Sequence, residues 1–171
     1  GDVRGVLVCS NYHVRDAERF ATRYDAPVYC SSWLSRAVSK LDAPIDPETD
    51  PVGTSGFELC RCRPFPGGSE AVAYREFDET LYVPDVLGTA PLFTVGEEQL
   101  GMYLLCRFVP PRAVFDDLTP RRILVGHGTG IFENSSIALR TALDGARQRV
   151  PAALRSNGWG QLRALTAALV D

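Results

Sequence analysis

Short apolar runs alternate with helix-like spacing along the first forty residues. Residues 5–9 form an apolar run typical of a buried strand. Apolar side chains from Ala17 to Tyr24 then recur at i, i+3, i+4 and i+7, which predicts one face of a helix. Residues 27–30 predict a second strand, and residues 31–41 predict a second helix that two serines cap. This part of the chain therefore has the order β-α-β-α.

The middle of the chain has a different pattern. Residues 42–56 carry three prolines and two glycines among acidic residues, which predicts a long surface loop without regular structure. Strand-like runs follow at residues 57–63, 71–77 and 80–83, separated by short turns. Such spacing is typical of neighbouring antiparallel strands in one sheet.

The last third returns to strand and helix patterns. Residues 103–109 fit either a helix or a strand, whereas residues 122–125 predict a strand that runs into a glycine-rich loop. We expect the following helix to stop at Pro151. A final helix is predicted after a turn at residues 156–158. The α/β order indicates a single layered domain over residues 1–171.

Composition excludes several classes of protein. The 171 residues are 45% hydrophobic and 23% charged, which fits one soluble domain. A net charge of -3 gives no basic footprint for nucleic acid, and no apolar run is long enough to span a membrane. The two histidines, His13 and His127, lie too far apart in sequence for a Cys2His2 zinc finger. Five cysteines, several of them inside apolar runs, indicate reduced thiols, so we expect a cytoplasmic protein.

Polar residues follow three of the predicted strands. They lie in residues 10–16, around Asp85, and around His127, and they include both histidines of the chain. Because α/β sheets build their sites where strands end, these segments are the candidate functional site. The simpler interpretation of each residue alone is a helix cap, a turn residue or an ordinary hydrogen-bonded histidine.

The order of these segments resembles the metallo-β-lactamase superfamily over about residues 3–150. Its members carry an H-x-H-x-D-H loop before a helix, a histidine after a Pro/Gly turn, a Gly-Asp-x-Leu segment and a strand that ends in Gly-His. The matching segments here are Asn11-Tyr12-His13-Val14-Arg15-Asp16, Pro66-Gly67-Gly68, Pro84-Asp85-Val86-Leu87 and Val125-Gly126-His127-Gly128. The resemblance implies an αββα sandwich and a site where one or two metal ions, usually zinc or iron, activate water for hydrolysis.

Only part of the family's ligand set matches. His13, Asp85 and His127 correspond to metal ligands, whereas Asn11, Arg15, Asp16 and Gly68 replace the other four. A catalytic zinc takes three protein ligands plus water, and neither family site keeps three of its own. The resemblance therefore implies a vestigial site without a cofactor. We expect the protein to bind a small molecule or a partner protein in that cleft rather than to hydrolyse a substrate.

Arg15 is the most informative of these replacements, because a guanidinium is always charged and cannot ligate a metal. At an assumed ~4 Å and an effective dielectric of ~20, it would oppose a divalent ion by about 8 kcal/mol. Our hypothesis is that Arg15 turns inward and pairs with Asp85, in place of a metal. The alternative is a solvated arginine at the start of a helix.

An enzymatic alternative remains open. Asp85 and His127, together with Asp16 or His13, would hold one zinc or iron ion and make the chain a mononuclear hydrolase. A weaker alternative is a phosphate-binding loop at Gly126, Gly128 and Gly130, although the spacing departs from G-x-G-x-x-G.

The resemblance also implies that strands are missing at the N-terminal end of the fold. Metallo-β-lactamases carry several strands before the first ligand loop, whereas residues 5–9 already form the strand that precedes it here. We therefore expect either that the chain matches a C-terminal portion of the usual fold, without some N-terminal strands, or that a partner chain supplies the missing edge. An unpaired sheet edge favours association, which makes a homodimer an expected partner state.

Overall fold

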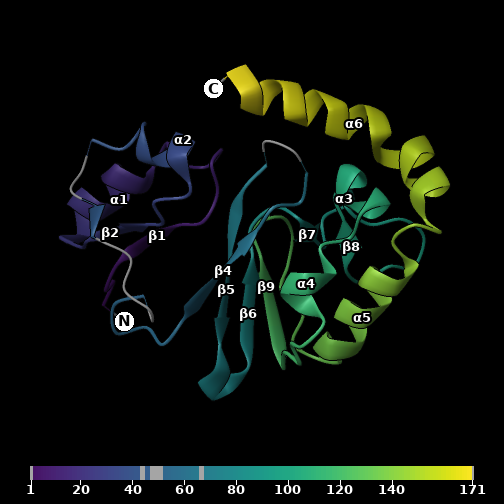
Figure 1. Cartoon of the computed structure of the whole chain (residues 1–171), viewed down its shortest axis with the longest axis horizontal. Coiled ribbons are helices and arrows are strands. Elements are labelled where there is room, and N and C mark those ends of the chain that lie inside the picture. Colours follow the sequence, from purple (N-terminus) through teal and green to yellow (C-terminus); the bar gives the residue numbers. More distant parts are fainter. Residues whose placement is uncertain (1, 43–44, 47–51, 66–67, 171) are drawn as a thin grey trace.

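The fold combines three sheets with six α-helices in the part of the chain that the structure describes (Figure 1). The structure is a computed structural model that describes residues 2–42, 45–46, 52–65 and 68–170. The predicted mixed α/β class is confirmed. Among these residues, no helix is both long and apolar enough to cross a bilayer.

The N-terminal part forms a small parallel sheet. Its strands lie in the order β1 (Val6–Val8), β2 (Val28–Cys30) and β3 (Ile45–Asp46), and Val6 pairs with Val28. Helix α1 (Ala17–Tyr24) forms the crossover connection between the parallel strands β1 and β2. Helix α2 (Ser35–Val38) then leads back toward β3.

A four-stranded sheet forms the centre of the molecule. The strands lie in the order β4 (Glu58–Cys62), β5 (Glu70–Arg75), β6 (Thr80–Val83) and β9 (Arg122–Val125). The first three are antiparallel, as the sequence predicted, and a short 3-10 helix, η1 (Glu76–Asp78), joins β5 to β6. Strand β9 pairs with β6 in parallel, so both strands end at the same edge.

Alternating side chains give the central sheet two buried faces. One face presents Val72, Leu81 and Ile123 to the C-terminal helices. The other presents Ala71 and Tyr82 to the N-terminal sheet and its helices. The central sheet therefore lies between two apolar cores, with helices beyond it on both sides (Figure 1).

The C-terminal half supplies the helices of the larger core. A two-stranded sheet of β7 (Leu87–Gly88) and β8 (Gly101–Met102) leads into this region. These helices are α3 (Leu104–Phe108), α4 (Arg112–Phe115) and α5 (Ser135–Gly145), whereas α6 (Val150–Val170) packs in a separate small cluster with Val95 and Leu104. Residues 103–109, which fitted either a helix or a strand, are thus mainly helical.

The N-terminal predictions need two corrections. Helix α2 begins only after Leu34, because residues 31–34 form a turn in which the Leu34 amide donates to the Ser31 carbonyl. No serine caps it. The predicted irregular loop contains strand β3, since two residues suffice to pair with the free edge of β2. Residues 43–44 and 47–51 of that loop lie outside the described part of the chain.

The C-terminal helix boundaries were also predicted wrongly. Helix α5 ends at Gly145, and Pro151 lies in the first turn of α6, where its missing amide proton costs nothing. The expected turn at residues 156–158 is helical. The Asn157 side chain donates to the Thr94 carbonyl at 3.0 Å, and this tertiary contact supports helix where local propensity is weak.

Candidate functional site

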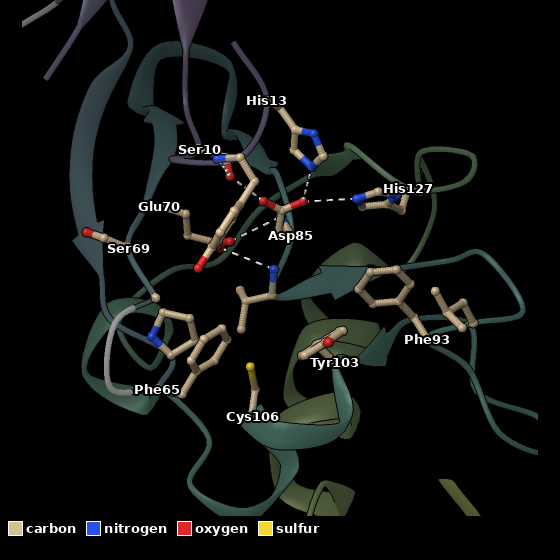
Figure 2. Close-up of a pocket in the computed structure, with 15 residues that line it drawn as sticks. Ser10, His13, Phe65, Ser69, Glu70, Asp85, Phe93, Tyr103, Cys106 and His127 are labelled. Atoms are coloured by element: carbon tan, nitrogen blue, oxygen red, sulfur yellow. Dashed lines mark hydrogen bonds and ion pairs between the residues drawn. The ribbon is translucent and has the colours of Figure 1, made fainter. Parts of the chain in front are cut away.

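Three loops from two different sheets meet beside one cavity (Figure 2). Asp85 follows β6 and His127 follows β9, and the pairing of Val83 with Val125 sets both side chains level at one sheet edge. His13 comes from the loop after β1. That loop is attached to the central sheet because Ser10 forms a bridge with Glu70. The structure therefore brings together the three segments that the sequence singled out.

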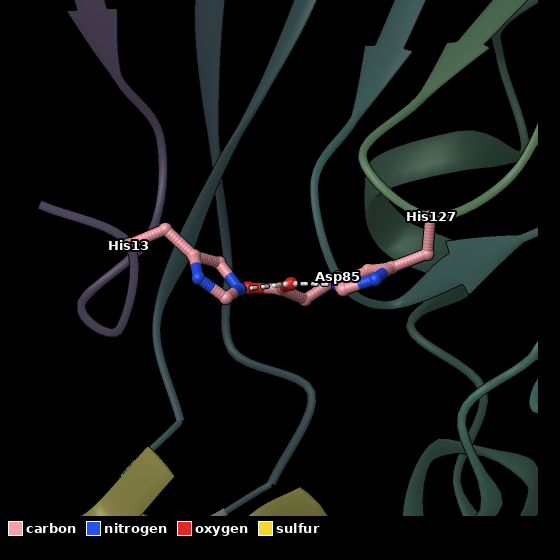
Figure 3. A group of neighbouring side chains, drawn as sticks. All are labelled: His13, Asp85 and His127. Atoms are coloured by element: carbon pink, nitrogen blue, oxygen red, sulfur yellow. Dashed lines mark hydrogen bonds and ion pairs between the residues drawn. The ribbon is translucent and has the colours of Figure 1, made fainter. Parts of the chain in front are cut away.

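The Asp85 carboxylate lies between the two histidines (Figure 3). Its Oδ1 atom is 3.0 Å from His13 Nε2 and 2.9 Å from His127 Nε2. One potential ligand atom from each residue lies within 4.8 Å of the others. No other such group of histidine, cysteine or acidic side chains occurs among the residues with described positions.

Hydrogen bonds determine the charge of this cluster. Burial alone would raise the pKa of Asp85, but hydrogen bonds from His127, His13 and the Ser10 hydroxyl outweigh burial and hold that pKa well below its usual range. The hydrogen bond to Asp85 in turn raises the pKa of His13. Asp85 is therefore a carboxylate at neutral pH, able to bind either two imidazole protons or a cation.

A second carboxyl group lies behind Asp85. Glu70 is only 3% exposed, and its two oxygens accept the backbone amides of Asp85 and Val86 at 3.1 and 3.2 Å. Burial and the charge of Asp85 raise its pKa well above the usual value. Glu70 thus fixes the backbone that carries Asp85. Glu70 was not predicted as a site residue, although a glutamate at the start of an apolar strand indicates a buried carboxyl group.

Mostly apolar side chains form the cavity, which has a volume of about 140 Å3. Phe93 stacks on the His127 ring with their centroids 5.2 Å apart, and Tyr103 lies behind Phe93 at 6.2 Å. Phe65 and Cys106 complete the wall in Figure 2. Burial raises the pKa of the Cys106 thiol well above its usual value, which favours the neutral thiol over the reactive thiolate.

The hypothesis that Arg15 pairs with Asp85 is wrong. The Arg15 side chain is 89% exposed, and its Nε donates to Asp16 at 3.4 Å. The adjacent helix starts at Ala17 and directs this side chain to solvent. Asp16, which we considered as a metal ligand, is committed to the same surface pair and lies outside the cluster.

Two residues that the resemblance to metallo-β-lactamases aligns with metal ligands make structural contacts instead. Asn11 is 8% exposed, and its side-chain oxygen accepts the Ala37 amide at 3.2 Å, which ties the first loop to α2. Gly68 lines the cavity, where a Cβ atom would come within 2.8 Å of the Phe65 ring. A histidine in this position would require Phe65 to move.

The glycines after β9 serve close backbone packing. A Cβ at Gly126 would collide with the Pro84 carbonyl, and one at Gly128 would collide with Thr89. Gly128 also has a φ of 110°, which favours glycine. These glycines hold His127 against the Asp85 loop, and this accounts for them without a phosphate.

The chain was also compared with known proteins. No known family model matches it, and no curated protein matches its sequence.

Proposed function

We propose that the protein is a hydrolase that uses a single metal ion bound by His13, Asp85 and His127. The observation that carries this proposal is the convergence of two imidazole nitrogens and one carboxylate oxygen within 4.8 Å, from three separate loops, beside a cavity. The exposed position of Arg15 removes the positive charge that would have opposed a cation.

The donor set fits zinc or ferrous iron. Neutral imidazoles and carboxylates ligate both metals, and three protein ligands leave a position open for water. A metal bound there would supply Lewis acidity and lower the pKa of bound water.

In this proposal, the residues around the cluster orient its ligands and bind the substrate. Ser10 and Glu70 hold the Asp85 side chain and backbone, so that the carboxylate keeps one orientation. Phe93 restricts rotation of the His127 ring by stacking on it. The apolar cavity beside the cluster binds the uncharged part of a substrate and excludes water from it.

A metallo-β-lactamase-like αββα arrangement is part of the proposal. It is supported by the order of the three loops along the chain and by the central sheet's two cores with helices beyond them. We further propose a cytoplasmic setting, which the five free thiols support. A homodimer is supported by the edge position of β4.

Metal content and activity test the proposal together. Protein purified without chelator is analysed for zinc, iron and manganese, and is assayed on thioester, lactam and phosphodiester substrates. We expect about one equivalent of metal and hydrolysis of one substrate class. Asp85→Asn removes both, whereas the matched control Asp16→Asn keeps both because Asp16 lies outside the cluster. Activity that survives in Asp85→Asn contradicts the proposal.

A second candidate function is ligand binding without hydrolysis. It is favoured by the hydrogen bonding of Asp85, whose two oxygens already accept from three side chains. For this candidate, Asp85→Asn changes ligand affinity, and the protein contains metal far below one equivalent.

A further inference from the structure

An open groove of about 850 Å3 adjoins the cavity along strand β4. Groove and cavity share a wall that is formed by Pro64, Phe65, Gly68 and Ser69. A molecule that lies in this groove therefore passes directly beside the cavity of the His13, Asp85 and His127 cluster. The groove is large enough for an organic group the size of a small substrate.

Two arginines at the end of the edge strand line the groove. Arg61 lies in β4 and Arg63 directly follows it; both are exposed and Cys62 between them is buried, so the two arginines lie on the same side of the chain. The Arg61 guanidinium lies 5.2 Å from the centre of the Trp33 ring, which also lines the groove. Stacking on Trp33 orients this guanidinium in the absence of a ligand.

The charge of the groove is not balanced locally. Neither arginine forms an ion pair with a residue that the structure describes, and no carboxylate occurs among the described lining residues. Two like charges on the same side of the chain repel each other. An anion between them reduces this repulsion and accepts two parallel hydrogen bonds from a guanidinium.

Part of the groove lining is apolar. Leu105 and Val109, at 40% and 67% exposure, present aliphatic side chains to the groove from α3 and the residue after it. Together with Trp33 they offer a surface for a hydrocarbon or aromatic group. The groove thus combines a cationic edge with an apolar wall, and both adjoin the candidate metal site.

We propose that this groove binds the anionic end of the substrate, with Arg61 and Arg63 holding a phosphate or carboxylate and Trp33, Leu105 and Val109 contacting an apolar body. Assigning the ligand as substrate rests on the proposed function above. The substrate class is then a soluble amphiphilic organic anion whose cleavable bond lies next to the cavity. Arg61 and Arg63 would select this class over neutral analogues.

Calorimetric titration with 2-naphthyl phosphate tests the groove without any metal. The protein is first treated with EDTA, and Arg61→Gln, Arg63→Gln and the control Arg140→Gln are compared with the natural chain. Arg140 is an exposed arginine on α5 that does not line the groove. One charge-assisted hydrogen bond contributes about 1.5–3 kcal/mol, so each groove variant should bind about 10- to 100-fold more weakly. Arg140→Gln should bind like the natural chain.

The choice of probes distinguishes binding through charge from binding through apolar contact. We expect 2-naphthol and inorganic phosphate each to bind more weakly than 2-naphthyl phosphate, and raised salt to weaken the phosphate ester. Equal affinity of all three variants for 2-naphthyl phosphate overturns the proposal, as does inorganic phosphate binding as tightly as the ester. Zinc titration of the same samples reports separately on the metal. Anion binding without zinc binding contradicts the proposed hydrolase alone, and zinc binding without anion binding contradicts the groove assignment alone.

Discussion

Replacement of Glu98 by glutamine tests the interaction that anchors one wall of the site. Glu98 and Arg107 form a bidentate ion pair with nitrogen–oxygen distances of 2.6 and 2.9 Å, and their side chains are only 1% and 0% exposed. The same guanidinium donates to the Phe93 carbonyl at 2.7 Å. The pair therefore holds the backbone of Phe93, and the ring of this residue stacks on His127.

The size of the effect follows from the burial of both charges. Glu98→Gln leaves the Arg107 guanidinium inside the protein without a counter-charge, and breaking a buried pair in this way costs about 3–5 kcal/mol. A glutamine retains one acceptor, so we expect a loss of about 3 kcal/mol. For a chain of this length, that corresponds to a fall in Tm of about 6–12 °C.

Urea unfolding followed by circular dichroism measures this loss directly. The neighbouring Glu97→Gln is the matched control, since Glu97 is exposed and its replacement should change stability by less than about 0.5 kcal/mol. The loss in Glu98→Gln should persist at high salt, because buried charges are weakly screened. A loss in Glu98→Gln no larger than that in Glu97→Gln would refute the reasoning.

Three further predictions concern the cluster and the central sheet. Ser10→Ala removes the 2.6 Å hydrogen bond to Asp85 and should weaken zinc binding about 10- to 100-fold by calorimetry; unchanged affinity would show that Ser10 does not orient the carboxylate. Gly126→Ala forces a Cβ atom against a backbone carbonyl and should lower the free energy of unfolding by about 1–3 kcal/mol in urea, which an unchanged midpoint would contradict. Arg75 holds the pKa of Asp78 below its ordinary value of 3.8, so Asp78 stabilises the fold at neutral pH and loses this effect as the pH falls below that value. The stability difference between the natural chain and Asp78→Asn should therefore be largest near pH 6 and narrow below pH 4, and a constant difference would exclude this cause.

The parts of the fold that the sequence predicts well are those where local pattern and tertiary contact agree. Strands β4, β5 and β6 alternate between two buried faces, and this period of two is visible in the sequence. Residues 156–158 carry a serine, an asparagine and a glycine, which favour a turn locally. A long-range bond from Asn157 to Thr94 overrides that preference, and no local pattern contains it.

The site also contains residues that the sequence predicts and residues that it does not. His13, Asp85 and His127 follow apolar strands, so their convergence could be predicted from where strands end. The direction of Arg15 depends on the turn that precedes α1, and residue type alone does not determine it. Glu70 was missed because its role depends on accepting hydrogen bonds from two backbone amides in a loop that is distant in sequence.

Anomalous scattering from crystals soaked in zinc gives the most direct test of the proposed metal centre. We predict one strong peak at bonding distance from His13 Nε2, His127 Nε2 and an Asp85 carboxylate oxygen, and no peak in crystals of Asp85→Asn. A well-ordered crystal in which His13 and His127 both still donate to Asp85, with no peak between them, would contradict the account.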